Sequence, residues 1–412
     1  MEIPTWTLGQ RPLFGKGDLD LRAGPPMTDR AADVRVLFEA AFDAPAVCAA
    51  RAPGRVNLIG EHTDYNGGLV LPAAIELSTR VALRLRPDGI VRGISRERGR
   101  AEARLEDPPA GDWLDYVRGT ARVLSDAGLA RETGFEIAVL SDLPEGAGLS
   151  SSAALEAAAA LALMSASGAS ETDLDRPGLA RLCQRAEAEF AGVPCGIMDQ
   201  YAVLCTTRGA AVLLDCARVQ ARSVPLPQAV EILIFDTGVS RALRSGGYAQ
   251  RRGECERALE NARRALGRSL GSLSELDLGD LTQLSRALDP VALRRARHVV
   301  SENARVREFA AALESGDLAR AGSAMFASHE SLRVDYDVTV SESDALVEGA
   351  RALPGCIGAR MTGAGWGGCT VHLVEAAQAP AFAAGLARYF QERFGREPRH
   401  WRTRSAAGAS LI

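Results

Sequence analysis

A glycine- and serine-rich loop joins an apolar strand to an alanine-rich helix in the first half of the chain. The strand pattern covers residues 135–140, the loop at residues 146–152 reads G-A-G-L-S-S-S, and the helix pattern continues to about Ser165. Glycines let backbone N–H groups converge on an anion, and the N-terminus of the following helix adds positive potential. The segment predicts a phosphate-binding loop or, as the simpler alternative, a serine-capped helix after a flexible turn.

Lysine is almost absent from the chain, and this excludes two large classes of kinase. Lys16 is the single lysine among 48 basic residues. Neither the Gly-Lys-Ser/Thr of a P-loop nor the strand lysine of a protein kinase can therefore be present. Enzymes that form a Schiff base through lysine are disfavoured on the same ground. Phosphate at the loop would be held by backbone amides, hydroxyls and a cation.

The composition excludes several other functions. The formal net charge of -4 argues against a protein built to hold nucleic acid or an anionic membrane surface. The longest apolar stretch, residues 157–164, is too short to span a bilayer. The 8 cysteines form no C-x-x-C pair and the 5 histidines no ligand-spaced pair, so no structural zinc site is expected. The start of the chain lacks the apolar stretch of a secretory signal, which favours a cytoplasmic location.

The length of 412 residues predicts two domains. Residues 1–28 are rich in glycine and proline and are expected to form a flexible arm. We expect an N-terminal domain over residues 29–220 and a C-terminal domain over residues 221–412. The strands expected in the first half cover residues 48–51, 69–75, 79–85, 135–140 and 210–215. The helices expected in the second half cover residues 248–266, 290–314, 318–332 and 379–394.

A second polar segment, residues 55–68, reads R-V-N-L-I-G-E-H-T-D-Y-N-G-G and follows an apolar strand. Glu61, His62 and Asp64 lie within four consecutive residues. Closely spaced acceptors suit a polyhydroxylated ligand, because each carboxylate can accept several hydroxyl protons. A solvated turn at the Asn-Gly pair would account for the same residues.

Two more segments carry candidate functional residues. Asp199 follows Gly196, Ile197 and Met198, where partial burial would make a carboxylate reactive, and an arginine such as Arg55 would keep it ionised. A helix-capping aspartate is the alternative. Residues 361–369 contain 4 glycines within six positions, which permits close approach of the backbone to a ligand or to another loop.

Taken in this order, these segments resemble those of the galactokinases, a branch of the GHMP small-molecule kinase family. Residues 54–66 are similar to the signature at the sugar site, residues 144–154 to the phosphate-binding motif, and residues 362–369 to the third family motif. The resemblance covers about residues 45–405. Its most specific part is the stretch E-H-T-D-Y-N, since other GHMP kinases usually keep little of it.

The resemblance implies a fold and a reaction. The fold is the α+β, two-domain GHMP kinase architecture, with a left-handed βαβ crossover in the N-terminal domain and a ferredoxin-like C-terminal domain. The reaction is ATP-dependent phosphorylation of α-D-galactose at the anomeric hydroxyl, with Mg²⁺ as cofactor, in galactose catabolism. We expect a monomer or weak homodimer. A related or broadened sugar 1-kinase and a non-catalytic galactose sensor are the alternatives.

The resemblance also implies roles for individual residues. Asp199 matches the proton acceptor, and Arg55 matches the arginine that stabilises the transferring phosphoryl group. The implied sugar-binding residues are Glu61, His62, Thr63, Asp64 and Tyr248. The implied nucleotide-binding residues are Gly146, Ala147, Gly148, Leu149, Ser150, Ser151, Ser152 and Ser95. The implied magnesium ligands are Ser152 and Glu187.

The chain departs from the family pattern in two places. Gly246 and Gly247 stand where the family usually has Ser-Glu before the sugar-contacting tyrosine. Ala364 and Trp366 replace the usual glycine and phenylalanine of the third motif. We expect the glycine pair to hold Tyr248 less firmly and so to affect sugar selectivity.

Overall fold

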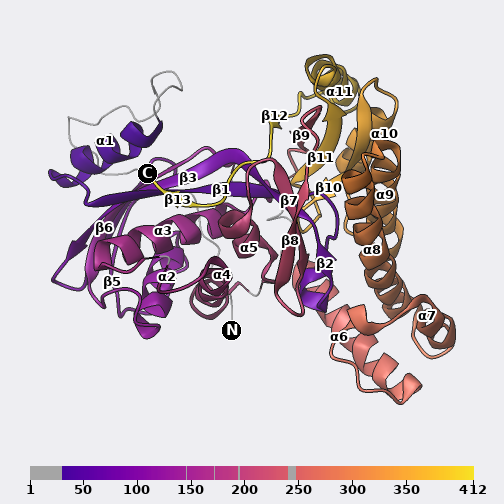
Figure 1. Cartoon of the computed structure of the whole chain (residues 1–412), viewed down its shortest axis with the longest axis horizontal. Coiled ribbons are helices and arrows are strands. Elements are labelled where there is room, and N and C mark those ends of the chain that lie inside the picture. Colours follow the sequence, from indigo (N-terminus) through magenta and orange to yellow (C-terminus); the bar gives the residue numbers. More distant parts are fainter. Residues whose placement is uncertain (1–29, 145, 171, 194, 240–246) are drawn as a thin grey trace.

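The computed structural model describes residues 30–144, 146–170, 172–193, 195–239 and 247–412. The chain forms two parts that lie side by side, each built on its own sheet (Figure 1). The arm expected over residues 1–28 lies outside the described residues, as does Gly246. Within the described ranges, no helix is both long enough and apolar enough to cross a membrane.

The first part contains a six-stranded sheet in the order β13-β1-β3-β6-β4-β5. Its side chains alternate between two faces, as the period of two in a strand requires. Ala49 and Ala82 face one hydrophobic cluster, whereas Ala50 and Val81 face another. The strands are β1 (Cys48–Asn57), β3 (Pro72–Arg86), β4 (Ile90–Ser95), β5 (Gly99–Arg104), β6 (Gly134–Ser141) and β13 (Ser410–Leu411).

Several of these strands differ from the sequence prediction. β1 continues beyond residue 51 to Asn57, with a register shift between Pro53 and Arg55. β3 is a single strand that covers most of residues 69–75 and 79–85, where two strands were expected. The hairpin of β4 and β5 was not predicted. The sequence of β5 alternates arginine and glutamate with glycine and alanine, so it carries little apolar signal.

Helices cover both faces of this sheet (Figure 1). α1 contacts β3 and β6 on one face, and α3 contacts β1 and β3 on the other. The alanines of α3 are buried, and their small side chains let the helix lie close to the sheet. The helices are α1 (Arg30–Phe42), α2 (Leu114–Asp126), α3 (Ser151–Ser167), α4 (Arg176–Arg185), the π-helix η2 (Ala186–Phe190) and α5 (Met198–Cys205).

A small three-stranded sheet, β2-β7-β8, lies between the two parts (Figure 1). Its strands are β2 (Leu69–Val70), β7 (Ala210–Asp215) and β8 (Gln220–Pro225). β7 and β8 form an antiparallel hairpin, so the expected domain boundary near residue 220 falls at the first residue of β8. The division of the chain stays a proposal, and a boundary at residues 226–229 would keep the hairpin whole.

The second part contains a four-stranded sheet in the order β10-β11-β9-β12, with all neighbours antiparallel. Numbered by their order in the chain, these strands lie in the sequence 2-3-1-4. This topology confirms the expected ferredoxin-like arrangement, in which two βαβ-type units interleave. The strands are β9 (Val230–Asp236), β10 (Cys356–Thr362), β11 (Cys369–Glu375) and β12 (His400–Thr403).

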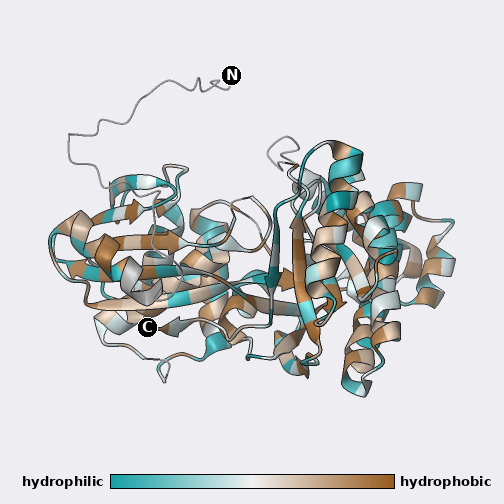
Figure 2. Cartoon of the chain, turned by 90° about the horizontal axis from the view of Figure 1, so that it is seen from above, coloured by the Kyte–Doolittle hydropathy of each residue, from teal (hydrophilic) through white to brown (hydrophobic). Residues whose placement is uncertain are grey.

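Long helices pack against the second sheet, and in Figure 2 they carry both hydrophilic and hydrophobic residues. α7 and α10 were not predicted, whereas α6, α8, α9 and α11 begin and end close to the expected residues. The helices are α6 (Gly247–Leu266), α7 (Leu278–Leu284), α8 (Pro290–Ser315), α9 (Leu318–Ser331), α10 (Ser341–Arg351) and α11 (Ala379–Phe394), with the short helical turns η4 (Leu273–Glu275) and η5 (Leu332–Tyr336).

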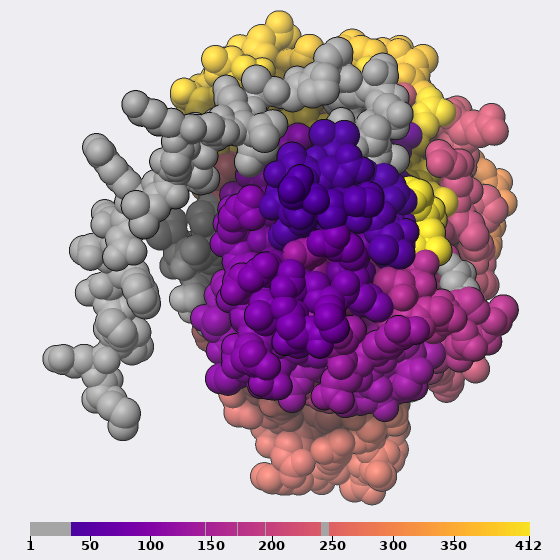
Figure 3. Space-filling model, turned by 90° about the vertical axis from the view of Figure 1, so that its left-hand side faces the viewer, coloured from indigo at the N-terminus to yellow at the C-terminus, as the bar shows by residue number. Residues whose placement is uncertain are grey.

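The end of the chain returns to the first sheet. β13 pairs with β1, Ile412 N donates to Ala49 O at 2.9 Å, and Arg35 Nη2 donates to Ile412 O at 3.0 Å. In Figure 3 the last residues lie beside α1. β4 and β6 are parallel neighbours connected through β5 and α2, and the left-handed sense expected for this crossover stays a prediction.

Candidate active site

Arg55 and Asp199 form a charged pair where β1, the loop before α3 and the first turn of α5 meet. Arg55 donates from Nε to Asp199 Oδ1 at 2.8 Å and from Nη2 to Oδ2 at 2.8 Å, which is a bidentate pair. Ser150 Oγ donates to the same Oδ2 at 2.6 Å. The side chain of Arg55 is 5% exposed and that of Asp199 is 28% exposed. The pair therefore orients the carboxylate while leaving part of it open to a ligand.

The glycine- and serine-rich loop is bonded directly to this pair. Arg55 Nη1 donates to Gly148 O at 2.6 Å, and Arg55 N donates to Leu149 O at 3.1 Å. A Cβ at Gly54 would lie 2.8 Å from Leu149 O, so only glycine allows this approach. Ser150 has a left-handed backbone with φ of 58°, and α3 begins at the next residue. The free N–H groups of the first turn of α3 thus lie next to Asp199.

Ser152 and Glu187, expected to bind magnesium, lie together. Burial raises the pKa of Glu187, and the neighbouring Ser152 hydroxyl partly offsets this effect. Gln200 Nε2 donates to Glu187 Oε2 at 2.5 Å and to Glu156 Oε2 at 3.2 Å, so one amide bridges two carboxylates. The sequence analysis missed Gln200 and Glu156. One signal was available, because Glu156 is the single charged residue of α3 and lies four positions after Ser152, on the same helix face.

Asp64 and Tyr248 face the same region as Asp199. Asp64 begins the short turn η1 (Asp64–Asn66), and a Cβ added at Gly196 would overlap its carboxyl. Burial, together with the negative charge of Asp199, raises the pKa of Asp64 to about 7. The ring of Tyr248 lies edge-on to Tyr65 with centroids 5.2 Å apart. Burial raises the pKa of Tyr248 as well, and the charge of Asp64 contributes.

Two neighbours of Asp64 point into the protein instead. Glu61 Oε1 accepts hydrogen bonds from Gly363 N at 2.6 Å and from Thr362 Oγ1 at 3.2 Å. Thr63 Oγ1 lies 2.8 Å from Gly60 O and 2.7 Å from Leu69 O, and its single proton is shared between these two carbonyls. Both side chains are buried, and Glu61 holds the stretch against the glycine-rich residues 361–369. Their direct contact with a sugar stays a prediction.

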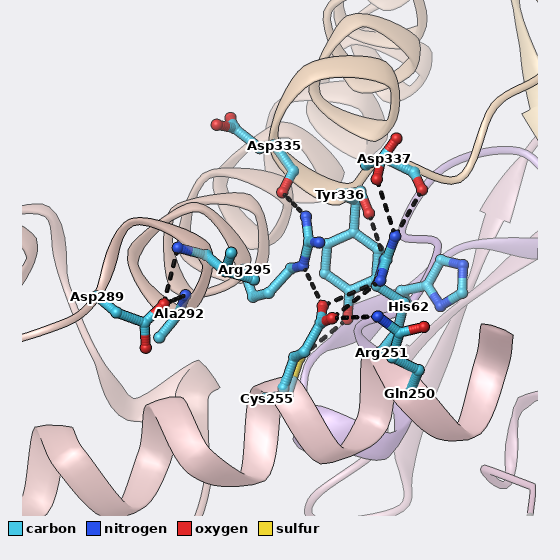
Figure 4. A network of polar contacts seen from close by, with 12 residues as sticks. His62, Gln250, Arg251, Cys255, Asp289, Ala292, Arg295, Asp335, Tyr336 and Asp337 are labelled. Atoms are coloured by element: carbon cyan, nitrogen blue, oxygen red, sulfur yellow. Dashed lines mark hydrogen bonds and ion pairs between the residues drawn. The ribbon is translucent and has the colours of Figure 1, made fainter. Parts of the chain in front are cut away.

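His62 connects this stretch to α6 through a chain of hydrogen bonds. Its Nε2 lies 3.0 Å from Ala364 O, which can only accept, so Nε2 carries the proton. Burial lowers the pKa of His62 to about 3, so the ring is neutral and Nδ1 accepts from Tyr65 Oη at 2.9 Å. Tyr336 Oη must then donate to Tyr65 Oη at 2.8 Å, and Cys255 Sγ, 3.0 Å from Tyr336 Oη, donates in turn. Figure 4 shows His62, Tyr336 and Cys255 within this network.

Ser95 lies at the end of β4, and its hydroxyl caps the turn into β5. It accepts hydrogen bonds from Glu97 N at 3.3 Å and Arg98 N at 3.2 Å and donates to Glu97 Oε2 at 3.2 Å. These partners all belong to the turn. The expected position of Ser95 near adenine stays a prediction.

Comparison with known proteins identifies the family. Three family descriptions match successive parts of the chain: the galactokinase galactose-binding signature at residues 37–85, the GHMP kinases N terminal domain at residues 115–207 and the GHMP kinases C terminal at residues 309–392. The galactokinase of Chloroflexus aggregans is 43% identical over 383 residues, which cover 91% of this chain and 96% of that protein. The chain belongs to the galactokinase family. The galactokinase of Homo sapiens is 41% identical over 400 residues, covering 94% of this chain and 98% of that protein.

A solved structure supports the same assignment for the fold. The galactokinase of Lactococcus lactis complexed with galactose matches with a TM-score of 0.87 at 34% identity, over 92% of this chain and 99% of that chain. The two-domain α+β GHMP kinase fold expected from the sequence is thereby confirmed. As a member of the galactokinase family, the chain is a small-molecule kinase. The galactose-binding signature spans both Arg55 and Asp64, and the N-terminal domain match spans the phosphate loop and Asp199.

Proposed function

We propose that this chain transfers the γ-phosphoryl group of ATP to the anomeric hydroxyl of α-D-galactose, giving α-D-galactose 1-phosphate and ADP. The observation that carries the proposal is the Asp199 carboxylate, held by Arg55 and Ser150 directly beside the glycine-rich loop. A proton acceptor, a fixed cation and a helix N-terminus lie within one hydrogen-bonded cluster. These are the groups that phosphoryl transfer to a hydroxyl requires, because catalysis there is mainly positioning and charge stabilisation.

The Asp199 carboxylate is the proton acceptor in this mechanism. Oδ2 already accepts hydrogen bonds from Arg55 Nη2 and from Ser150 Oγ, which occupy both of its lone-pair directions. Oδ1 accepts one from Arg55 Nε and also lies 2.7 Å from Arg55 Nη2, so Arg55 holds both oxygens. The Asp199 side chain is 28% exposed, and we assign its carboxylate as the group that takes the proton from the 1-hydroxyl of the sugar. The freed oxygen then attacks the γ-phosphorus in line with the departing ADP.

Arg55 and the start of α3 stabilise the charge on the moving phosphoryl group. The guanidinium is fixed by Gly148 O as well as by Asp199, so it needs no reorganisation during transfer. The first N–H groups of α3 lack helical partners and carry the positive end of the helix dipole. Ser151 and Ser152, in this first turn, are half-buried and can donate hydroxyls to phosphate oxygens.

Ser152 and Glu187 fit a magnesium ion. Both offer oxygen, the donor that Mg²⁺ prefers, and the Ser152 hydroxyl lies close enough to the Glu187 carboxyl to lower its pKa. Among the described residues no group of three or more His, Cys, Asp or Glu side chains could hold a metal. Two protein oxygens suit Mg²⁺, which usually completes its shell with water and substrate phosphates. When bound, Mg²⁺ would neutralise charge on the β- and γ-phosphates.

The sugar would lie against Asp64 and Tyr248. Asp64 offers carboxylate oxygens to sugar hydroxyls, and Tyr248 presents an aromatic ring at the same edge of the site. The match to a galactokinase complexed with galactose supports galactose as the sugar.

A coupled assay for ADP release tests the function. Purified protein with ATP and Mg²⁺ should release ADP with galactose and far more slowly with glucose, mannose or N-acetylgalactosamine. The Asp199→Asn variant should lose this activity, whereas Asp126→Asn, at an exposed aspartate at the end of α2, should keep it. Equal rates across the sugars would favour a broadened sugar 1-kinase. Galactose binding without ADP release would favour a sensor.

Two further expectations accompany this proposal. The cytoplasmic location and the monomeric or weakly dimeric state stay predictions. Cell fractionation tests the first and analytical ultracentrifugation the second.

A further inference from the structure

Gly247, the first residue of α6, lies directly against the indole of Trp366. A Cβ added at Gly247 would lie 2.9 Å from Cε2 and Cζ2 of Trp366 and 3.1 Å from its Cδ2. Distances below 3.0 Å are essentially never seen between a real Cβ and a neighbouring heavy atom. A side chain at position 247 and the indole at its present place therefore exclude one another.

The backbone that carries the indole, in the glycine-rich residues 361–369, is firmly held. Trp366 has a left-handed backbone with φ of 55°, and its backbone N–H donates to Val338 O at 2.7 Å. A Cβ at Gly365 would clash with Val338, and a Cβ at Gly367 would clash with Val239. The turn is thus packed against backbone on both sides of Trp366, whose side chain is buried. A clash at Gly247 would have to be relieved by movement of α6.

Arg251, one turn further along α6, contacts the same indole. Its guanidinium carbon lies 5.6 Å from the centre of the Trp366 ring, a cation–π contact. Arg251 is itself fixed, because Nε donates to Tyr336 O at 2.7 Å and Nη2 donates to Asp337 Oδ2 at 3.0 Å (Figure 4). Residues 247 and 251 are four positions apart, so they lie on one face of α6. The indole therefore sets the rotation of the first turn of this helix.

The rotation of α6 decides where Tyr248 points. Residue 248 follows Gly247 by one position, about 100° around a helix of 3.6 residues per turn. With the 247–251 face against Trp366, the ring of Tyr248 lies 5.2 Å from Tyr65 and 6.0 Å from His62, beside Asp64.

We propose that Trp366 is a positioning residue for Tyr248 and that Gly247 and Trp366 form one compensated pair. The two departures from the family pattern then belong together, since the larger ring occupies the space that the missing side chain leaves. This reverses the expectation that glycine at 247 loosens Tyr248. The inference rests on the proposed function, in which Tyr248 contacts the sugar.

A double-mutant cycle tests the pair, with Gly247→Ala, Trp366→Phe and the combined variant. Gly253→Ala is the matched control, because Gly253 lies in the same helix and its added Cβ would meet only Arg257 Nη1, at 3.6 Å. Gly247→Ala should raise the KM for galactose on the order of tenfold and leave the KM for ATP within about twofold, as overpacking at one site would. The combined variant should return to within about threefold of Trp366→Phe, since phenylalanine lacks the outer atoms of the indole.

Each outcome decides the proposal. The proposal is supported if adding Trp366→Phe to Gly247→Ala restores the KM for galactose. If Gly247→Ala folds poorly, restoration of the melting temperature by Trp366→Phe supports it in the same way. The proposal is overturned if Gly247→Ala changes the KM for galactose no more than Gly253→Ala does. It is also overturned if the effects of Gly247→Ala and Trp366→Phe on that KM simply add in the combined variant. If the parent protein releases no ADP with galactose, the proposed function fails on its own, and the melting temperatures of the four variants still measure the coupling.

Discussion

Asp64 offers the sharpest test of the sugar site, through the pH dependence of galactose binding. Burial and the charge of Asp199 raise the pKa of this carboxyl to about 7 in the free protein. A protonated carboxyl has lost much of its capacity to accept sugar hydroxyls. Galactose should therefore bind more tightly as the pH rises through 7.

The raised pKa of Asp64 sets the magnitude of this effect on galactose binding. A group with a pKa of about 7 is roughly 90% ionised at pH 8 and roughly 10% ionised at pH 6. If the ionised form is the one that binds, the dissociation constant for galactose should be about tenfold higher at pH 6 than at pH 8. In Asp64→Asn the constant should be high and flat across this range, because an amide accepts more weakly and does not titrate. The loss at pH 8 should be about 5- to 100-fold.

The same shift predicts an effect on stability of the opposite sign. The folded pKa lies above the ordinary value of 3.8, so ionisation of Asp64 destabilises the sugar-free fold. Stability should fall as the pH rises from about 4 through 7, by at most ~4 kcal/mol for a pKa difference of about 3. Asp64→Asn should therefore melt at a higher temperature than the parent protein at pH 8.

Isothermal titration with galactose between pH 6 and pH 8 measures the first effect, with ATP titrated in parallel. ATP binding should not follow the ionisation of Asp64, and Asp126→Asn should keep the galactose slope. A flat galactose profile in the parent protein would refute the assignment. A slope that persists in Asp64→Asn would show that another group titrates.

Three further predictions concern the proton acceptor, the metal ligand and the packing of the second part. Asp199→Asn should lower turnover by about 10²- to 10⁴-fold while galactose binding changes less than about tenfold; turnover like the parent's would exclude its role as base. Glu187→Gln should raise the Mg²⁺ concentration needed for half-maximal activity by about tenfold and leave galactose binding unchanged, which a magnesium titration checks. Gly322→Ala should lower the free energy of unfolding by ~3 kcal/mol, because its Cβ would overlap Ile357 O. Ser323, exposed on the same helix, provides the control, since Ser323→Ala should leave the free energy of unfolding nearly unchanged; urea titration measures both.

The glycine-rich motifs could be predicted from the sequence because the backbone conformation that requires glycine is a local property. Gly146 and Gly148 have positive φ, which favours glycine, and at Gly54 a Cβ would collide with the Leu149 carbonyl. The same holds for the long helices, whose apolar period is a property of a single segment. Strands with mixed composition, such as β5, carried no such signal and were missed.

Partners across the chain depend on tertiary structure. The pairing of Arg55 with Asp199 joins residues 144 positions apart, and the sequence suggested it only through the resemblance and the need for a nearby cation. The inward orientation of Glu61, toward Gly363, could not be inferred, because a carboxylate in a loop looks the same in a sequence whichever side it faces. Gln200 was missed for the same reason, since its bridge between two carboxylates exists only after α3, η2 and α5 pack together.

The sequence by itself therefore determined the family, the reaction class and the local conformations of its three glycine-rich segments. Only the tertiary structure decided how the departures from the family pattern combine. Gly247 and Trp366, 119 positions apart in the sequence, each look like an isolated change until the indole is seen against the glycine Cα. The physical reason is that steric exclusion acts over a few ångströms in space, and the distance between two residues along a chain does not record it.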